Sequence, residues 1–372
     1  MKEAKRSTGA PLRPFLGGIG IGWCLCNVGS FLNGSLSLQQ YVVQLSPQTE
    51  YNNSSSYMYQ TQTQTQTQTQ TQTAENDRMK RWIKYSKKYR YISPASRDDY
   101  AQPVPIKQCG TGPDYAPWFQ LDIKERSRFH EDKIIYELLF KNSTTTSATT
   151  TRSGFGDSGG TYLELGAFNG VQESNTRFFD DCLGWKGLLI EANPGIYQET
   201  IENRPFAHKM SFAPSCSAES TVPFHRVKWT NGGLQGYAVA YNNSKAKPTV
   251  DVPCGPLSPV LADIFADDHW DNNTTAPVLP TLDFFSLDVE GAEALVLSTI
   301  DFQAIRINVL MIEIQNSFCT DNNCEVRRQV RAKMALEGYQ RYEGLVRASD
   351  VYVHPESRFQ IPDSVATPKP IK

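Results

Sequence analysis

From Thr161 onward, short apolar segments alternate with amphipathic ones, and no other pattern in the chain restricts its fold as strongly. The spacing predicts strands at TYLEL, KGLLIE, residues 208–212, LDFFSLDV and NVLMIEI, with helices between them, and a final hairpin from YQRYEGL and SDVYVH. Strands that alternate with helices form a mainly parallel, doubly wound sheet. The predicted class is therefore α/β and Rossmann-like, and ligands on such a sheet bind at the carboxyl ends of the strands.

The first of these strands ends in a glycine turn. Gly166 and Gly170 follow the strand directly, and Glu164 stands two positions before the first glycine. This spacing differs from G-x-G-x-x-G, which disfavours a nicotinamide-dependent oxidoreductase. An acidic residue just before a glycine turn is instead typical of the loop that binds S-adenosylmethionine (SAM). The alternative interpretation is that Glu164 only caps a turn.

The second strand ends at Glu191, about 20 residues beyond the glycine turn, where Rossmann-like folds carry a carboxylate for a ribose. Two adjacent ribose hydroxyls are donors that a carboxylate accepts. The combination of Glu191 with the glycine turn is more specific than either half alone. The alternative is a carboxylate that is favoured at a helix start by the helix dipole.

The fourth strand runs into a cluster of carboxylates, Asp288, Glu290 and Glu293. Asp288 is expected at the strand tip, facing the ligand crevice. There, together with Glu290, it would suit general-base removal of a proton from a hydroxyl nucleophile. The same two carboxylates would also suit a Mg²⁺ or Ca²⁺ ion, or could cap the following helix, and the sequence leaves these alternatives open.

Over roughly 128–354 the chain resembles the FkbM-type methyltransferase family. The resemblance rests on a series of segments in the family's order: EDKIIYELLF, YLELGAFNGVQESNTRFFDDCLGWKGLLIEANP, VPCGPL, DFFSLDVEGAEALVLSTIDF and VLMIEI. It implies the class I SAM-dependent methyltransferase fold, a seven-stranded sheet of order 3-2-1-4-5-7-6 with strand 7 antiparallel.

The resemblance also implies a set of site residues. It places Glu164, Gly166, Ala167, Phe168, Asn169 and Gly170 in the SAM loop, Glu191 on the ribose, Ala192 and Asn193 beside the adenine, and Asp288 by the reacting methyl. Members are typically O-methyltransferases that act on hydroxyls of sugars or polyketides. Residues 141–160 and 226–250 fall outside the family pattern, and we expect acceptor specificity to reside in the second of these stretches.

The N-terminus has the layout of a targeting segment. Basic residues precede an apolar, uncharged stretch, and residues 1–38 are interpreted as a signal anchor or a cleaved signal peptide, with an organelle transit peptide not excluded. The corresponding locations are the membrane of the secretory pathway (ER or Golgi, type II) or the exterior.

Residues 39–115 are predicted to be a disordered stem, because strict Gln-Thr alternation from Gln60 to Thr73 buries no apolar surface. Within the stem, the basic and aromatic segment 79–91 is interpreted as solvated, or as docking on the domain or on an anionic membrane. The methyltransferase domain is expected at 116–355 and a flexible tail at 356–372.

The cysteines and sequons agree with a secretory route. Cys319 and Cys324 bracket a short polar loop where a disulfide is expected in an oxidising lumen, whereas Cys182 is also explained as a buried free thiol. N-glycosylation sequons occur at Asn33, Asn52, Asn53, Asn142, Asn242, Asn272 and Asn273.

The charge balance argues against a nucleic-acid partner. The formal net charge is −2 over 372 residues, without the basic excess that phosphate recognition needs. The leading hypothesis is a SAM-dependent O-methyltransferase that acts on a hydroxyl-bearing small molecule or glycan. The second hypothesis is a non-catalytic, membrane-anchored methyltransferase-like adaptor in secretory trafficking, since a fold can be kept without its chemistry.

Overall fold

The computed structural model describes residues 73, 76–97, 107–110, 115–141, 160–225, 232–235, 249–266, 279–314 and 324–370. All of them lie in one compact unit, Thr63–Lys372. The predicted targeting segment 1–38, most of the Gln-Thr tract and all seven sequons lie outside these residues. Within them, no helix combines the length and the apolar character needed to cross a membrane.

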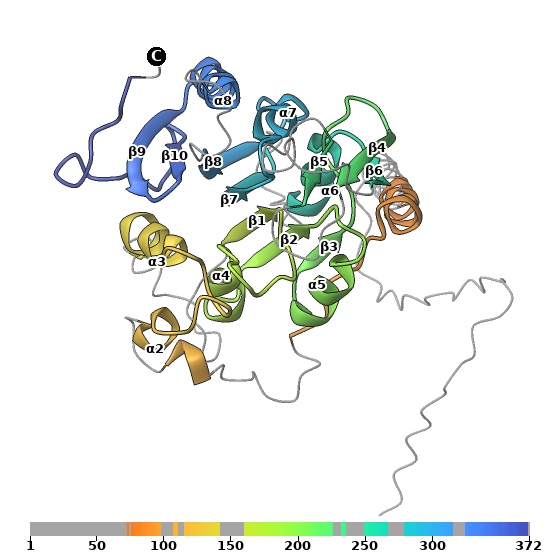
Figure 1. The fold of residues 1–372 in the computed structure, drawn as a ribbon, viewed down its shortest axis with the longest axis horizontal. Coiled ribbons are helices and arrows are strands. Elements are labelled where there is room, and N and C mark those ends of the chain that lie inside the picture. Colours follow the sequence, from red (N-terminus) through yellow and green to blue (C-terminus); the bar gives the residue numbers. More distant parts are fainter. Residues whose placement is uncertain are drawn as a thin grey trace, which may run out of the picture. The chain divides into compact units, whose positions relative to one another are not determined.

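A seven-stranded sheet of order β3-β2-β1-β7-β8-β10-β9 forms the centre of the domain (Figure 1). Its strands are β1 Thr161–Leu165, β2 Lys186–Ile190, β3 His208–Met210, β7 Thr281–Leu287, β8 Arg306–Glu313, β9 Gln340–Val346 and β10 Ser349–Val353. The pairs from β3 to β8 are parallel, and β10 is antiparallel to both of its neighbours. The predicted fold class, strand order and antiparallel strand are confirmed.

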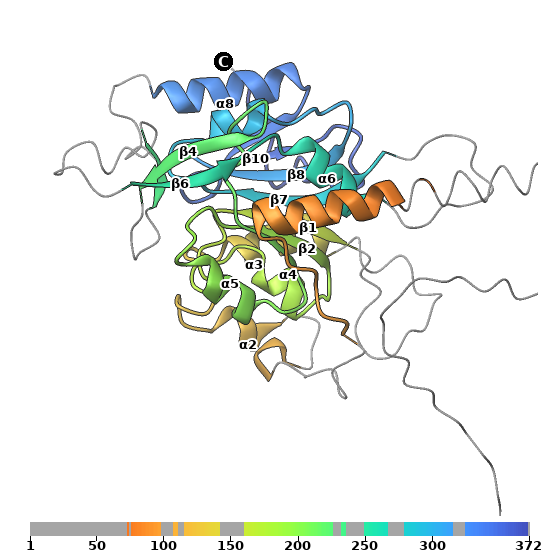
Figure 2. The ribbon, with the colours of Figure 1, turned by 90° about the vertical axis from the view of Figure 1, so that its right-hand side faces the viewer.

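Helices cover both faces of this sheet, because the side chains of each strand alternate between them. In β1, Leu163 and Leu165 pack into one apolar cluster with helices α6, α7 and α8, whereas Tyr162 packs into another with α2, α3 and α4. Figure 2 shows α3, α4 and α5 on the opposite side from α6 and α8. The helices are α2 Ala116–Phe119, α3 Glu131–Ile135, its π-helical continuation η2 Tyr136–Phe140, α4 Arg177–Asp181, α5 Tyr197–Asn203, α6 Ser258–Phe265, α7 Glu293–Ser298 and α8 Glu325–Leu336, with a short 3₁₀ turn η1 at Lys107–Cys109.

A second, three-stranded antiparallel sheet of order β5-β4-β6 was not expected from the sequence. Its strands are β4 Ser220–His225, β5 Gly233–Leu234 and β6 Thr249–Cys254. Their polar, partly exposed residues carry a weak strand signal, and the neighbouring stretches 226–231 and 236–248 lie outside the described residues.

The predicted disordered stem is wrong for residues 76–97, and the alternative that segment 79–91 docks on the domain is confirmed. A helix at residues 76–89, here called the N-terminal helix (orange in Figure 2), buries Tyr85 and Tyr89 in the core beside α6. Trp82, Tyr85 and Tyr89 recur on one face of this helix, so the segment has the apolar stripe that docks a helix on a domain.

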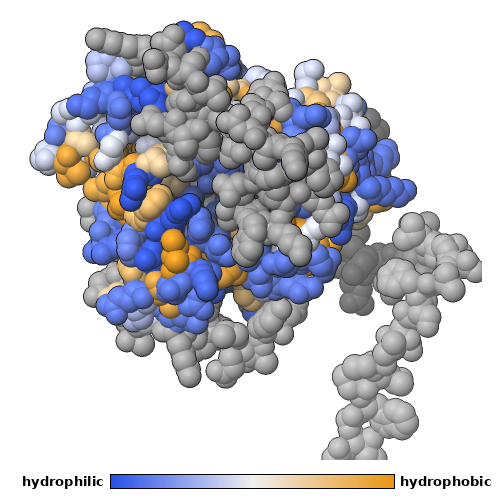
Figure 3. Space-filling model, viewed as in Figure 1, coloured by the Kyte–Doolittle hydropathy of each residue, from blue (hydrophilic) through white to orange (hydrophobic). Residues whose placement is uncertain are grey.

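The predicted flexible tail at 356–372 is also wrong for most of its length. Phe359 and Ile361 are buried in the cluster around α3 and α4, and the Phe359 ring lies 4.6 Å from that of Phe140. Lys369 and Arg341 form a backbone bridge. The apolar side chains are gathered in these clusters, and the described surface in Figure 3 is mainly hydrophilic with small separate apolar areas.

Two disulfides lie within the described residues, Cys109–Cys182 and Cys216–Cys254. The interpretation of Cys182 as a free thiol is therefore wrong. Cys324 is disulfide-bonded as well, while Cys319, its predicted partner, lies outside the described residues.

Reduction of the disulfides is expected to lower the free energy of unfolding by about 2–5 kcal/mol, because each bridge restricts the unfolded chain. Urea unfolding followed by tryptophan fluorescence, with and without dithiothreitol, measures this difference. The variants Cys109→Ser/Cys182→Ser and Cys216→Ser/Cys254→Ser separate the two bridges. An unfolding midpoint that reductant leaves unchanged would contradict a stabilising role for both.

Candidate active site

A cavity of about 330 Å³ opens at the carboxyl ends of β1, β2, β7 and β8, which is the size range of small-molecule sites. Nine of the eleven residues predicted for the site line it: Glu164, Gly166, Ala167, Phe168, Glu191, Ala192, Asn193, Asp288 and Glu290. The other two, Asn169 and Gly170, lie behind the wall. Asn169 accepts hydrogen bonds from the Val171 and Gln172 amides and so shapes the turn.

Glycine is required at position 166 because the chain after β1 lies very close to the chain after β7. Its φ is +86°, and a Cβ there would lie 1.8 Å from the Asp288 backbone oxygen. Only glycine allows β1 and β7 to approach this closely where they reach the cavity.

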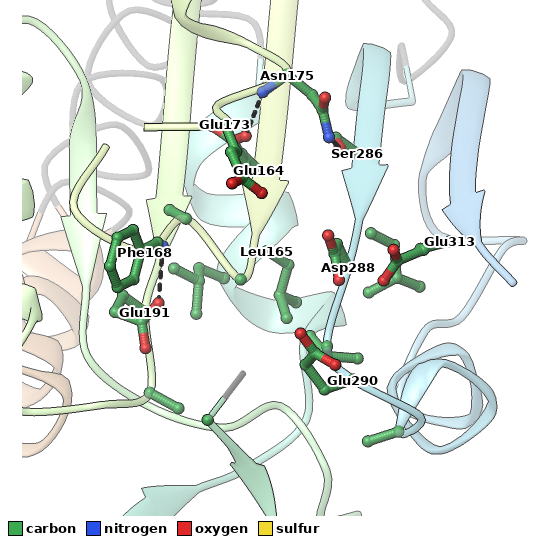
Figure 4. Close-up of a pocket in the computed structure, with 18 of the residues that line it drawn as sticks. Glu164, Leu165, Phe168, Glu173, Asn175, Glu191, Ser286, Asp288, Glu290 and Glu313 are labelled. Atoms are coloured by element: carbon green, nitrogen blue, oxygen red, sulfur yellow. Dashed lines mark hydrogen bonds between the residues drawn. The ribbon is translucent and has the colours of Figure 1, made fainter. Parts of the chain in front are cut away.

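The Glu164 carboxylate is buried and organises the loop that follows the glycine turn. It accepts hydrogen bonds of 2.7 Å each from the Ser174 hydroxyl, the Asn175 amide and the Thr176 hydroxyl. Figure 4 shows the bond from Asn175. Burial raises the pKa of Glu164, opposed by the nearby charge of Arg204, whose Nη1 lies 3.9 Å away. Glu164 therefore fixes the shape of the wall that contains Ser174 and Asn175.

Arg204 supports the glycine turn from behind and was not singled out by the sequence. It is completely buried, and it donates hydrogen bonds to Asp180, to the Gly170 carbonyl and to the Tyr162 hydroxyl. A Cβ on Gly170 would lie 2.8 Å from the Arg204 side chain, so the glycine makes room for this arginine.

Glu191 lies at the end of β2 with its carboxylate at the cavity. One oxygen accepts a hydrogen bond from the Phe168 amide at 2.8 Å and the other from the Asn193 amide at 2.6 Å (Figure 4). Burial raises the pKa of Glu191 to about 7, despite these two amides. Each oxygen keeps a lone pair, so the carboxylate can accept further hydrogen bonds from a ligand.

Asp288 and Glu313 form a carboxyl pair at the adjacent ends of β7 and β8 (Figure 4). Burial raises the pKa of Asp288 well above its usual range, and the charge of Glu313 and a hydrogen bond with it add to this effect. The Asp288 Oδ1 atom is buried and has no hydrogen-bond partner within the described residues. Two carboxyls in this arrangement share a proton and ionise in two steps.

Sequence reasoning missed Glu313, although a signal was available. It is the last residue of β8 and lies inside the predicted strand segment NVLMIEI. Leu287 pairs with Ile312 in the sheet, so the residues that follow them, Asp288 and Glu313, are neighbours.

Glu293, the third carboxylate of the cluster, holds the backbone after β7. It is fully buried and accepts hydrogen bonds from the Val289 and Gly291 amides. Burial raises its pKa to about 7. No group of three or more His, Cys, Asp or Glu side chains in the described part of the chain is arranged to hold a metal ion, so the cation site considered for Asp288 and Glu290 gains no support.

The mouth of the cavity combines aromatic and charged side chains. The Arg128 and Arg347 guanidinium groups lie 5.4 and 4.5 Å from the centre of the Phe129 ring. Phe224 and Leu234 of the small sheet line the cavity as well. Leu234 lies in the stretch 226–250 that was expected to carry acceptor specificity, whereas Arg128, Phe129, Phe224 and Arg347 were not singled out by the sequence.

The methyltransferase FkbM domain family matches residues 164–341, from the glutamate of the glycine turn to β9. No curated protein matches the chain.

Proposed function

Since residues 164–341 are an FkbM methyltransferase domain, we propose that the chain binds SAM and transfers its methyl group to the oxygen of a hydroxyl acceptor. The observation that carries this proposal is the Glu191 carboxylate, which lies at the cavity and is held by the Phe168 and Asn193 amides. A methyltransferase of this family usually takes SAM as its cofactor.

The cavity fits SAM in the chemistry of its donors. Glu191 would accept hydrogen bonds from the two ribose hydroxyls, with Ala192 and Asn193 beside the adenine. The glycine turn would leave room for the rest of the molecule. Glu164, Asp288, Glu290 and Glu313 give the other end a negative character that favours a sulfonium and an ammonium group.

The Asp288–Glu313 pair supplies the base. SAM brings a methyl group that is already activated, so the protein has to align the acceptor oxygen and remove its proton. The acceptor hydroxyl would donate to the unpartnered Oδ1 of Asp288. The Asp288–Glu313 pair would take up the proton of the acceptor hydroxyl when that oxygen receives the methyl group. We infer no step that needs a metal ion.

The acceptor class is a hydroxyl-bearing small molecule or a glycan. Phe129 at the mouth offers an aromatic face, and the surrounding carboxylates accept hydrogen bonds from hydroxyls. Gly232 and Leu234, both inside the stretch 226–250 that departs from the family pattern, line the cavity. This agrees with a role for that stretch in acceptor specificity.

We further propose that the enzyme works in the secretory pathway or outside the cell, held to a membrane by its N-terminal segment or released from it. The Cys109–Cys182 and Cys216–Cys254 disulfides support this, because structural disulfides persist in oxidising compartments. Deglycosylation of the natural protein by an amidase, read as a mass shift, tests the route.

Calorimetric titration of SAM into the full-length chain, with NADH as a control, tests the cofactor. Glu191→Ala is expected to weaken SAM binding by about 10²–10⁴-fold, since two charge-assisted hydrogen bonds of about 1.5–3 kcal/mol each are lost. Unchanged affinity would show that the cofactor assignment is wrong. No SAM binding by the folded wild type would favour the non-catalytic adaptor.

SAM affinity is expected to fall as the pH is lowered through 7. The pKa of Glu191 is about 7 without ligand, and ribose hydroxyls donate to the ionised form, so binding must expel the proton below that pH. Titrations at pH 6, 7 and 8 measure this slope, which Glu191→Gln should abolish. Glu293→Gln is a matched control, because Glu293 has the same raised pKa but lies behind the cavity wall, and this variant should keep the slope.

A further inference from the structure

The N-terminal helix, which precedes the family domain, is attached to the domain by specific contacts. The Tyr85 hydroxyl donates to Asp263 at 2.8 Å, and the Arg81 guanidinium donates to the same carboxylate at 2.7 Å. Lys84 and Lys88 both pair with Glu219. The middle and the C-terminal part of this helix are therefore fixed to α6 and to the residue before β4.

The segment after the helix extends the edge of the large sheet. Ile92 and Lys209 of β3 exchange two backbone hydrogen bonds of 2.9 and 3.0 Å. Further along, the Ala95 amide donates to the Pro205 carbonyl, and Arg97 pairs with the buried carboxylate of Asp180. Residues 90–97 thus cover the β3 edge, which would otherwise expose unpaired backbone groups.

This segment contacts the wall of the cavity from behind at two places. The Tyr89 ring stacks on the Phe212 ring with centroids 4.3 Å apart, and the Tyr89 carbonyl accepts a 2.7 Å hydrogen bond from the Ser211 amide. Phe212 is fully buried and lines the cavity. At the second place, the Tyr197 hydroxyl donates to the Arg90 carbonyl at 2.7 Å, next to the cavity residue Ile196.

Gly255 leaves room for the Tyr89 ring because glycine has no side chain. A Cβ on Gly255 would lie 2.3 Å from the Tyr89 hydroxyl oxygen. Tyr89 itself is only 2% exposed. The ring therefore occupies one fitted position directly behind the cavity wall.

We propose that Tyr89, which the segment 76–97 holds against the domain, is a positioning residue of the cofactor cavity: it fixes the Phe212 wall and thereby sets the affinity for SAM. This rests on the proposed function, since it assigns these residues to that same cavity. Without the Tyr89 ring behind it, the Phe212 side chain would move between several positions, and in some of them the cavity would no longer fit SAM. The functional unit consequently includes the segment 76–97, which precedes the family domain.

Tyr89→Ala tests this, with Trp82→Ala as the matched control. Trp82 belongs to the same helix and stacks on Tyr91 at 4.6 Å, away from the cavity residues. Tyr89→Phe keeps the ring and should behave as the wild type, and Tyr89→Leu keeps apolar bulk if the alanine variant does not fold. Circular dichroism establishes a temperature at which all variants are folded.

Two measurements are then compared in the full-length chain. Loss of the aromatic pair should raise the Kd for SAM about threefold to tenfold. Without any ligand, it should also speed amide hydrogen exchange at residues 211–215. Trp82→Ala should change neither. Equal Kd and equal exchange in Tyr89→Ala and Trp82→Ala would overturn the proposal. If the wild type does not bind SAM, the proposed cofactor is wrong, and the exchange data still decide whether Tyr89 holds the wall.

Discussion

Asp288→Asn is expected to lower kcat for methyl transfer by about 10²–10⁴-fold with little change in SAM affinity, because a general base contributes about that much. The substitution keeps the size of the side chain and its place at the end of β7, but the amide cannot take up the hydroxyl proton. Single-turnover assays with a hydroxyl acceptor, combined with SAM titration, separate the two effects. An unchanged rate would exclude Asp288 as the base.

The pH profile distinguishes proton transfer from a structural role of the pair. Burial and the charge of Glu313 both raise the pKa of Asp288, so the wild-type rate should rise with pH as the pair loses its proton. Glu313→Gln removes one of these causes and lowers the pKa of Asp288. The rising limb of the profile should then move to lower pH. A rate that falls without any such movement would mean that Glu313 only supports the fold.

Arg204→Met is expected to lower the free energy of unfolding by about 3–5 kcal/mol, the usual cost of breaking a buried ion pair. Methionine fills a similar volume but leaves the Tyr162 hydroxyl, the Gly170 carbonyl and one Asp180 oxygen without their donor. Urea unfolding measures the loss. The glycine turn rests on this arginine, so SAM binding should weaken in the same variant.

Arg306→Met is the matched control for this substitution. Arg306 also pairs with a carboxylate, Glu356 at 2.6 Å, but their side chains are 32% and 69% exposed. Exposed ion pairs contribute about 0–1 kcal/mol. Similar losses of stability in the two variants would contradict the special role assigned to burial at Arg204.

The strands of the large sheet could be predicted from local signals, whereas their order followed from the resemblance to the FkbM-type family. Each apolar segment from TYLEL to SDVYVH forms a strand, and the helix predicted through Glu293–Ser298 has those bounds. The predictions that were wrong concern segments whose structure depends on contacts with distant parts of the chain. Trp82, Tyr85 and Tyr89 give a helical stripe, yet the adjacent Gln-Thr tract and many lysines made the segment look solvated. Phe359 and Ile361 are isolated apolar residues whose burial depends on Phe140 and its neighbours.

The residues of the candidate site also fall into two groups, those that local sequence patterns predict and those that they do not. Glu164 lies in the last two residues of β1, and Glu191 and Asp288 directly follow β2 and β7, so their positions at one sheet edge follow from the strand pattern. Glu313 could have been predicted by adding the register of β7 and β8. The role of Arg204 could not have been predicted, because it depends on buried contacts with Tyr162, Gly170 and Asp180, which are distant from it in the sequence.

The place of β10 in the sheet has a consequence for biosynthesis. β10 is the last strand of the chain, yet it lies between β8 and β9. A ribosome-bound chain therefore has an open β8 edge until residues 349–353 have left the exit tunnel. A chain that stops before Ser349 would leave β9 without a partner strand, because in the described residues β9 pairs with the sheet only through β10. The β8 edge thus stays unpaired until β10 has been made.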